Sequence, residues 1–337
     1  MTLLRTIDQF RAHVVVNVNS DFESFAPDVK LVEAAHLKPL IGPALYNDLN
    51  ALSEADLAAL SGPMGELRDE LLCAAANLAA AEYLPMQQVQ MTDSGVYLLT
   101  TGDKKTAFQW QINQLLAAFR RKGFNALERA LAVLDEHVDE PAFEAWATSA
   151  AGTASHKYFL NTAAQFSEHY GINNSRLTYL ALLPTIRKME RFAIEPVLGL
   201  EFYLELKEQV MDRDLSADNL LVLEQYVRPA LAHLVVAKAV PELGMGLNGD
   251  AIELNVYRPD DTNGKEADAS IDSLLGMKVQ QAAADGQVYL TRLRQYLNKT
   301  ASATRYAAYF TSIAYQDPSG PRPVVRTEVA GRIFGFM

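Results

Sequence analysis

The sequence predicts a mainly α-helical, all-α protein: a tandem duplication of one helical domain, each half with a short β-hairpin insertion. One observation is a set of long alanine- and leucine-rich stretches whose apolar residues recur every three or four positions, the period of an amphipathic helix. The other is a motif that occurs twice, as HLKPLIGPALYNDL at 36–49 and as IEPVLGLEFYLEL at 194–206. The residues at matching places are Pro39, Gly42, Tyr46 and Leu49, then Pro196, Gly199, Tyr203 and Leu206.

Other segments repeat in the same order, which supports a duplication rather than a chance match. The matching pairs are TIDQF (6–10) with TAAQF (162–166), Glu33 with Glu190, NLAAAEYLP (77–85) with HLVVAKAVP (233–241), and GFNALERALAVL (123–134) with GQVYLTRLRQYL (286–297). The spacing between partners lengthens once, where the second half carries the polar stretch YRPDDTNGKEADAS, as a loop insertion would produce. We therefore predict two helical repeats, 1–155 and 156–300, followed by a C-terminal tail at 301–337.

Local patterns assign the elements of each half. GELRDELLCAAANLAAAEYL at 65–84 and ADNLLVLEQYVRPALAHLVVAKAV at 217–240 predict long helices, and TAFQWQINQLLAAFRRKG predicts a helix that ends at Gly123 behind basic residues. DSGVYLLTTGD at 93–103 and GDAIELNVYRPDD at 249–261 place β-branched and aromatic residues between turn formers, and so predict the hairpins. The repeated motif predicts a structural corner between two helices, with proline at the break and glycine at the turn.

Composition argues against several classes of protein. A net charge of −11 over 337 residues disfavours a phosphate-binding surface over most of the molecule, because nucleic-acid binding usually needs a basic face. The single cysteine, Cys73, lies in an apolar run and cannot form an internal disulfide. The N-terminus lacks a signal-peptide pattern and no window reaches about 20 apolar residues, so we expect a soluble intracellular protein without a membrane contact.

The sequence shows no catalytic or metal site. Glu33 and His36 have the spacing of one half of a di-iron site, but the residue that matches His36 is Ala193, so the other half is missing. Phosphate-binding glycine loops, the nucleophile elbow and paired cysteines are also absent from the sequence. We therefore expect no enzymatic activity, no cofactor, no metal ligand and no small-molecule substrate.

Two features are candidate partner contacts. The first is a basic group in an acidic chain: Lys104, Lys105, Arg120, Arg121 and Lys122. It either complements a helix C-terminus or contacts an acidic partner or nucleic acid. The second is the end of the tail, whose apolar side chains either pack back on their own domain or insert into a neighbouring subunit. Its candidate contact residues are Ile333, Phe334 and Phe336.

The corner motif, the alanine-rich helix after it and the segment VQMTDSGV…KKTAFQWQINQLLAAFRRKGFNALERAL resemble an uncharacterised family from phages and prophages of Bacteroidetes-type bacteria. Each half more distantly resembles the small helical head–tail connector (adaptor) proteins of tailed phages, which form a ring under the portal. Connectors of that kind are usually shorter and single-domain, whereas this chain is duplicated.

The resemblance implies a virion structural protein that assembles with portal or tail components and with copies of itself. It would be found in the host cytoplasm during assembly and then in the virion. A cytoplasmic helical scaffold or binding protein unrelated to virions remains the alternative.

Overall fold

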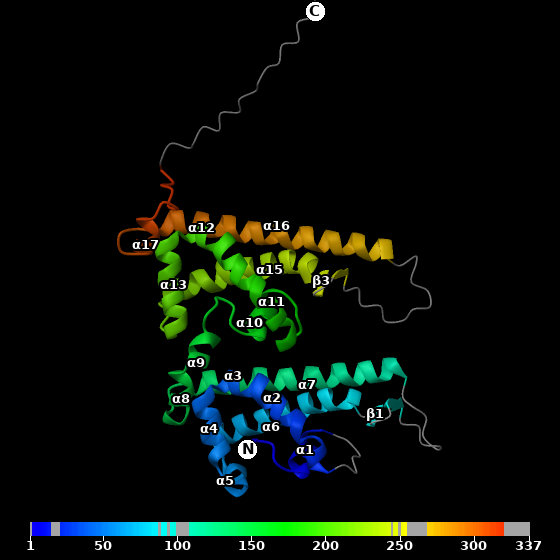
Figure 1. Cartoon of the computed structure of the whole chain (residues 1–337). Coiled ribbons are helices and arrows are strands. Elements are labelled where there is room, and N and C mark those ends of the chain that lie inside the picture. The colour runs from blue at the N-terminus through cyan, green and yellow to red at the C-terminus, as the bar shows by residue number, and fades with distance from the viewer. Residues whose placement is uncertain are drawn as a thin grey trace, which may run out of the picture.

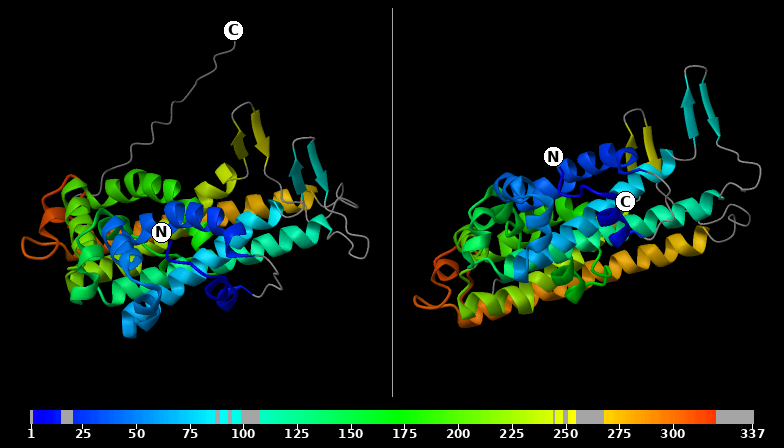
Figure 2. Two further views of the ribbon diagram at one scale, coloured as in Figure 1. Left: turned by 60° about the horizontal axis from the view of Figure 1, so that its bottom comes forward. Right: turned by 90° about the horizontal axis from the view of Figure 1, so that it is seen from below.

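The computed structural model describes residues 2–14, 21–86, 89–92, 95–98, 108–243, 245–248, 251–254 and 268–319. Two helical halves lie one above the other, the first coloured blue to green and the second green to orange-red (Figure 1). Each half has its own hydrophobic core, and the long helices of the two halves run alongside each other in the same orientation (Figure 2).

The two halves use similar elements in the same order. The first contains α1 (Ile7–His13), η1 (Phe22–Ser24), α2 (Ala26–Val32), η2 (Glu33–Leu37), α3 (Lys38–Ile41), α4 (Pro43–Ala51), α5 (Glu54–Ala59), α6 (Gly62–Met86), α7 (Gln109–Glu136), η3 (Pro141–Phe143), α8 (Glu144–Ala147) and α9 (Ala150–Ser155). The second contains α10 (Ala163–His169), α11 (Arg176–Met189), η4 (Glu190–Ile194), α12 (Glu195–Leu198), α13 (Leu200–Asp212), α14 (Ala217–Val222), η5 (Leu223–Val227), α15 (Arg228–Leu243), α16 (Asp268–Thr300) and α17 (Ala307–Phe310).

The repeated TxxQ sequence caps the first helix of each half. Thr6 accepts a hydrogen bond from the backbone N–H of Gln9, whose side-chain oxygen accepts the N–H of Thr6 in return. Thr162 accepts the N–H of Gln165 in the same way, at 3.1 Å. Both caps satisfy N–H groups that a helix start leaves without a partner, so this part of the sequence repeat has a local structural cause.

Three wide turns, η2, η4 and η5, are π-helical, and each is followed two residues later by a proline: Pro39, Pro196 and Pro229. A proline within a helix lacks the N–H donor and clashes with the carbonyl group four residues earlier. A π turn moves that carbonyl, and the N–H just before the proline bonds five residues back, as from Lys38 to Glu33. The X-Pro step therefore explains why the helices widen where they do.

The main packing unit of each half is an antiparallel pair of long helices, α6 with α7 and α15 with α16. Glycine allows the closest approach in each pair: a Cβ at Gly123 would lie 2.5 Å from Leu78 Cγ, and one at Gly286 would lie 2.6 Å from Leu234 Cγ. Within the described residues, one helical run, Ala217–Glu242, is long and apolar enough to cross a membrane. Since 56% of its apolar window is buried in the second core, a core helix accounts for it.

The strands require a correction to the predicted fold class. The described strands are β1 (Val89–Thr92), which pairs antiparallel with β2 (Gly95–Leu98), and β3 (Met245–Asn248), which pairs with β4 (Ala251–Leu254). Each pair stands apart from the helices (Figure 2), and the buried residues that form the two cores come from helices and their connections. The stretches chosen from the sequence contain β2 and β4 but miss β1 and β3. The fold class is therefore all-α: helices and their connections form both cores, the described strand pairs lie outside them, and the predicted hairpin insertions are not supported as part of the fold.

Two further expectations change. The predicted helix end at Gly123 is wrong, because α7 continues to Glu136 and Gly123 serves the contact with Leu78. The predicted boundary at residue 300 cuts through the second core, in which Tyr306 and Tyr309 are buried. The hydroxyl of Tyr309 also donates a 2.6 Å hydrogen bond to Asn298 on α16. Residues 301–315 therefore pack with the second half.

The halves meet through α7 of the first and α10, α11 and α13 of the second. Glu128 on α7 accepts a 2.6 Å hydrogen bond from the N–H of Ala163 and pairs with Arg176 at 3.0 Å. Asp135, two turns further along α7, lies 2.8 Å from the His156 ring nitrogen and 3.6 Å from the Arg213 guanidinium. Since the side chains of Glu128 and Arg176 are 12% and 11% exposed, this pair is screened from water and fixes the orientation of the halves.

We expect Glu128→Ala to lower the free energy of unfolding by about 3–5 kcal/mol, because it leaves the Arg176 guanidinium buried without its carboxylate. The matched control is Glu70→Ala, which breaks the 2.7 Å pair with Arg129 inside the first half. Since the Arg129 side chain is 55% exposed, that change should cost at most about 1 kcal/mol. Urea denaturation measures the free energy of unfolding of both variants. Equal losses of stability would contradict the role assigned to the contact between the halves.

Candidate functional site

A buried glutamate organises the first half. The Glu33 carboxylate accepts hydrogen bonds from the backbone N–H groups of Leu3, at 2.9 Å, and Leu4, at 3.0 Å. The hydroxyl of Tyr46 donates another, at 2.7 Å. Leu3 and Leu4 belong to no helix or strand, so this carboxylate supplies partners for buried N–H groups that secondary structure leaves unpaired. One side chain thereby joins the leading segment (residues 2–5) to the π turn and to α4.

Glu190 holds the same position in the second half. Its carboxylate accepts the N–H of Phe159 at 2.6 Å and forms a short ion pair with Lys207 on α13. Lys207 also donates a 2.7 Å hydrogen bond to the carbonyl group of Lys157, and its ammonium lies 4.4 Å from the centre of the Phe159 ring. Glu190 and Lys207 together therefore fix the second leading segment, residues 157–160, against η4 and α13.

The two halves place their cation on opposite sides of this contact. In the first half, Arg5 lies in the leading segment and donates to the carbonyl groups of Asn50, at 2.9 Å, and Leu52, at 2.7 Å, at the end of α4. In the second half the cation is Lys207, which occupies the position that matches Asn50 and reaches back to the leading segment. Both halves therefore join the leading segment to the helix after the corner through a cation, but the cation lies in the leading segment of the first half and in the helix of the second.

Burial dominates the electrostatics of both glutamates. It raises the pKa of Glu33 above the ordinary value of 4.5, against the opposing effect of the hydrogen bonds from Leu4 and Tyr46. Burial likewise raises the pKa of Glu190, although the Lys207 charge opposes the shift. The pKa of Lys207 is lowered by its own burial. Both carboxyl groups therefore cost free energy when they ionise.

The eight residues of the repeated motif lie at the corner after each π turn. Pro39 and Pro196 lie in the first turn of α3 and α12, while Tyr46, Leu49, Tyr203 and Leu206 are buried. Gly42 and Gly199 have φ of +79° and +75°, a backbone region that residues other than glycine rarely adopt. A short turn packs against each glycine: a Cβ at Gly42 would lie 3.1 Å from Ser149 Oγ, and one at Gly199 2.7 Å from Ser312 Oγ.

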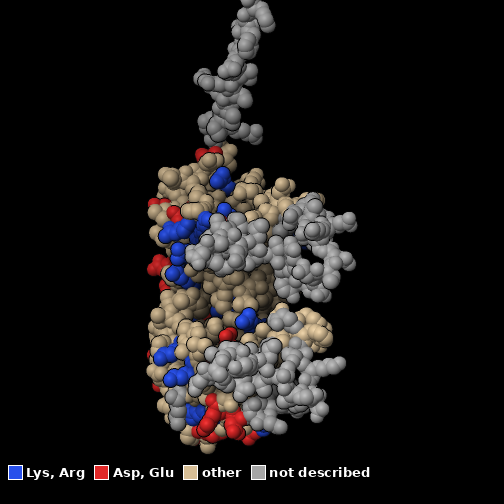
Figure 3. All heavy atoms as spheres, turned by 45° about the vertical axis from the view of Figure 1, so that its right-hand side comes forward, with Lys and Arg blue, Asp and Glu red and all other residues tan. Residues whose placement is uncertain are grey.

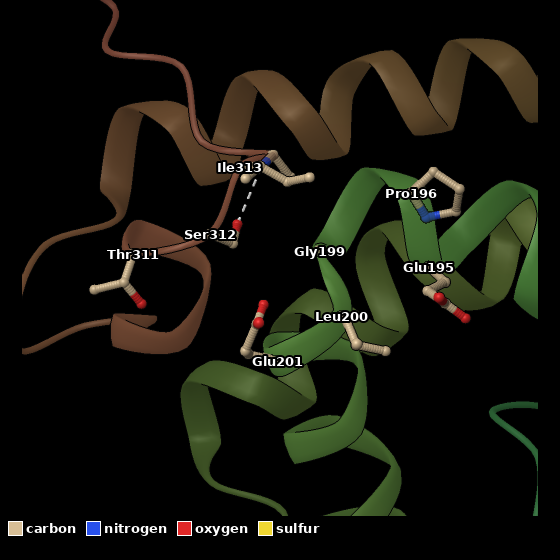
Figure 4. Close-up of a pocket in the computed structure, with 9 residues that line it drawn as sticks. Glu195, Pro196, Gly199, Leu200, Glu201, Thr311, Ser312 and Ile313 are labelled. Atoms are coloured by element: carbon tan, nitrogen blue, oxygen red, sulfur yellow. Dashed lines mark hydrogen bonds between the residues drawn. The ribbon is translucent and has the colours of Figure 1, made fainter.

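The second corner opens into a pocket of 510 Å³ (Figure 4). One side is the α12–α13 corner and the other is the turn after α17. The lining residues are Glu195, Pro196, Gly199, Leu200, Glu201, Thr311, Ser312, Ile313 and Ala314. The hydroxyl of Ser312 accepts the N–H of Ala314 at 3.2 Å and holds the turn in shape. The pocket thus combines exposed apolar side chains with two carboxylates.

The predicted basic group is only partly described, because Lys104 and Lys105 lie outside the described residues. Arg120, Arg121 and Lys122 are exposed in the middle of α7, so they do not complement the C-terminus of their own helix. Arg120 lies 3.9 Å from the Glu82 carboxylate. On the face shown in Figure 3, Lys and Arg side chains lie along one edge over both halves, and carboxylates gather at the far end of the first half. Ile333, Phe334 and Phe336 also lie outside the described residues.

Among the described residues, no group of three or more His, Cys, Asp and Glu side chains could hold a metal ion. His36, three residues after Glu33, instead lies edge-on against Phe124, with ring centres 5.4 Å apart. Burial lowers the pKa of His36.

Comparison with known proteins places the chain in a family. The profile of a family of unknown function, DUF6712, matches it twice, at residues 37–155 and 194–319. The chain belongs to the DUF6712 family. The two matches agree with the two-part arrangement seen in the sequence and the fold, and each contains one corner glycine. No curated protein and no solved structure matches the chain.

The sequence predicted the corner of this DUF6712 protein but not the buried contacts that hold it to the leading segment. Glu33 and Glu190 were matched as repeat partners, yet their burial and their hydrogen bonds to the leading segments were not foreseen. A usable signal exists, because each half has a glutamate six residues before the corner proline. The distant contact of Ser312 with Gly199 carries no comparable pattern.

The raised pKa of Glu33 predicts a pH effect on stability. As the pH rises above 4.5, the unfolded chain loses the Glu33 proton first, so the free energy of unfolding falls until the pH passes the raised pKa in the folded protein. Glu33→Gln keeps the shape and cannot ionise, but its NH2 group can only donate and faces backbone N–H donors, so the variant should be less stable by about 1–3 kcal/mol at pH 4.5. The difference in the free energy of unfolding between wild type and Glu33→Gln should then decrease toward pH 8.

Urea denaturation at several pH values measures that difference, with Glu23→Gln as the control at an exposed glutamate. The control should follow the wild type at every pH. A difference that increases with pH would show that the hydrogen bonds to Glu33 hold its pKa below the ordinary value, and would contradict the dominance of burial.

Proposed function

We propose that this protein is a structural component of a phage or prophage virion, of the head–tail connector type, which acts by assembly with other virion proteins and with copies of itself. The observation that carries the proposal is a surface suited to protein contact in the second half. Ile313 is fully exposed at 104% and Leu200 is 48% exposed beside it, on the rim of the corner pocket. Clustered exposed apolar side chains of this kind typically mark protein–protein contacts.

The construction of the halves supports the same proposal. Both corners rest on a buried glutamate that binds N–H groups of a distant segment, so the surface beside each corner is held by the core rather than by a mobile loop. A rigid surface loses less conformational freedom on association, which favours affinity. The resemblance of each half to phage connectors is the source of the virion assignment.

A helical scaffold or binding protein unrelated to virions is the second candidate, and one observation favours it. A smaller pocket of 260 Å³ lies beside the buried Glu190–Lys207 pair, lined by Tyr203, Leu204 and Met211 with Arg187 at its edge. Apolar walls with a few charged groups suit a small ligand or a peptide side chain. A partner bound there in a cell lysate, without any virion, would favour this candidate.

The proposal is tested by mass spectrometry of particles purified after induction of the prophages of the source strain. We expect the chain in DNA-filled particles at a fixed ratio to the major capsid protein, because a connector occurs in a set number of copies per virion. A tail tube protein from the same particles serves as the positive control. Intact particles that lack the chain would overturn the virion role.

Removal of residues 320–337 should leave the fold intact but reduce self-assembly. The described packing of the second half reaches Tyr315, so the melting temperature should change by less than about 2 °C. A variant with Ile333, Phe334 and Phe336 all replaced by serine keeps the length of the tail and is the matched control for lost apolar contacts. Light scattering across a concentration series measures the mass, and normal association of both proteins would show that the tail has no part in it.

A further inference from the structure

The two corners share one backbone, so each serves as a control for the other. Gly42 and Gly199 have ψ of 151° and 152° besides their similar φ. In the turns that pack against these glycines, Ser149 and Ser312 each donate a 2.7 Å hydrogen bond to the carbonyl group three residues earlier, that of Trp146 and that of Tyr309. The glycine and the serine hydrogen bond are therefore common to both corners, whereas the chain after the serine differs: α9 begins at Ala150, and Ile313 lies in a turn.

Four of the positions that line the second corner have changed in chemical type. The second corner has Glu195 where the first has Lys38, Leu200 for Pro43, Glu201 for Ala44, and Ile313 for Ala150. The first half builds the same corner with a cation, a proline and two alanines, so folding does not require the two acids and two large apolar residues. Their presence calls for a role outside the fold.

These four side chains surround the pocket. Figure 4 shows Leu200, Pro196 and Ile313 around the hollow, with the Glu201 carboxylate pointing toward the turn that contains Thr311 and Ser312. In the described part of the chain, no cation pairs with Glu201, whereas Glu195 accepts a 2.6 Å hydrogen bond from Arg191. The pocket therefore offers apolar contact area and negative charge together, and suits a segment with aromatic or aliphatic side chains next to an arginine.

We infer that the second corner pocket is a docking site for residues 332–337 of a second copy of this chain. In this segment, RIFGFM, Arg332 comes directly before Ile333 and Phe334. The arginine is complementary to the carboxylates of the pocket, and the two apolar side chains are complementary to its apolar rim. The wider stretch 320–337 has three arginines and one glutamate, opposite in sign to the pocket and to the acidic chain as a whole. The inference rests on the proposed assembly function and names the contact that would carry it.

Two observations favour a second copy over the chain's own pocket. Pro318, Pro321 and Pro323 follow soon after the pocket residue Ala314, and the sequence there favours an extended, semi-stiff backbone that does not fold back easily on itself. In addition, the Glu128–Arg176 contact that joins the halves cannot be repeated between copies, because Thr291 and Asp21 occupy the matching positions. Copies therefore need another contact, and a tail placed in the next subunit's pocket is head-to-tail, the kind that builds rings or filaments.

Disulfide trapping tests the inference on the purified full-length protein. In a Cys73→Ser background, one tagged batch carries Ile313→Cys and a second, differently tagged, carries Phe334→Cys, and the mixture is oxidised mildly. Ala150→Cys replaces Ile313→Cys in the matched control, since it sits at the same place in the first corner. We expect at least about tenfold more mixed disulfide dimer with Ile313→Cys than with the control, because a disulfide forms only when the two chains dock closely.

Charge reversal adds a specific readout. Glu201→Lys should lower the yield of mixed dimer about tenfold, and Arg332→Glu on the tail partner should restore it, since like charges oppose docking and opposite charges favour it. Equal yields of mixed dimer at both corners, or no rescue by Arg332→Glu, would overturn the inference. The assay needs no virion, so a trapped dimer together with particles that lack the chain would contradict the virion role alone.

Discussion

The hydrogen bonds of one buried carboxylate in each half are the constraint on which the rest of the structure depends. Glu33 and Glu190 lie in π turns and accept N–H groups from segments about 30 residues earlier in the chain. The turn places the carboxylate inward and accommodates the proline that follows, and the helix ends within one turn at the positive-φ glycine. The corner glycine then reverses the chain so that Tyr46 can reach Glu33. Entry, helix break and corner of each half are thereby tied at one point.

The duplication shows which features the fold needs and which are free to change. Both halves keep the glutamate, the X-Pro step, the positive-φ glycine and the serine turn that packs on it. The cation that clamps the leading segment is Arg5 in one half and Lys207 in the other, on opposite sides of the same contact. The surface around the second corner has diverged furthest, toward acids and exposed apolar side chains. Because the backbone motif is kept in both halves, a change of surface side chains between them points to function rather than to folding.

Much of this was accessible from the sequence, and the gaps have physical causes. Pro39 and Gly42 predict a helix break and a turn, because proline restricts the backbone and glycine allows a positive φ. Helical periodicity predicts the long helices. Gly123 was misread as a helix end since glycine at a terminus and glycine at a close helix contact look alike until Leu78 is placed beside it. The stretches chosen as hairpins contain β2 and β4 but miss β1 and β3, because composition marks turn formers but not register. The pocket joins residues more than 100 positions apart, and no local pattern reports that distance.

Amide hydrogen exchange of Leu3, Leu4 and Phe159 tests the central claim most directly. These N–H groups lie outside every described helix and strand, so by secondary structure alone they should exchange fast. If the buried glutamates hold each half together, the three amides should exchange as slowly as those in the middle of α6 and α15, and only through global unfolding. Fast exchange at Leu3, Leu4 and Phe159, with the long helices still protected, would show that the glutamate contacts open freely and would contradict the account.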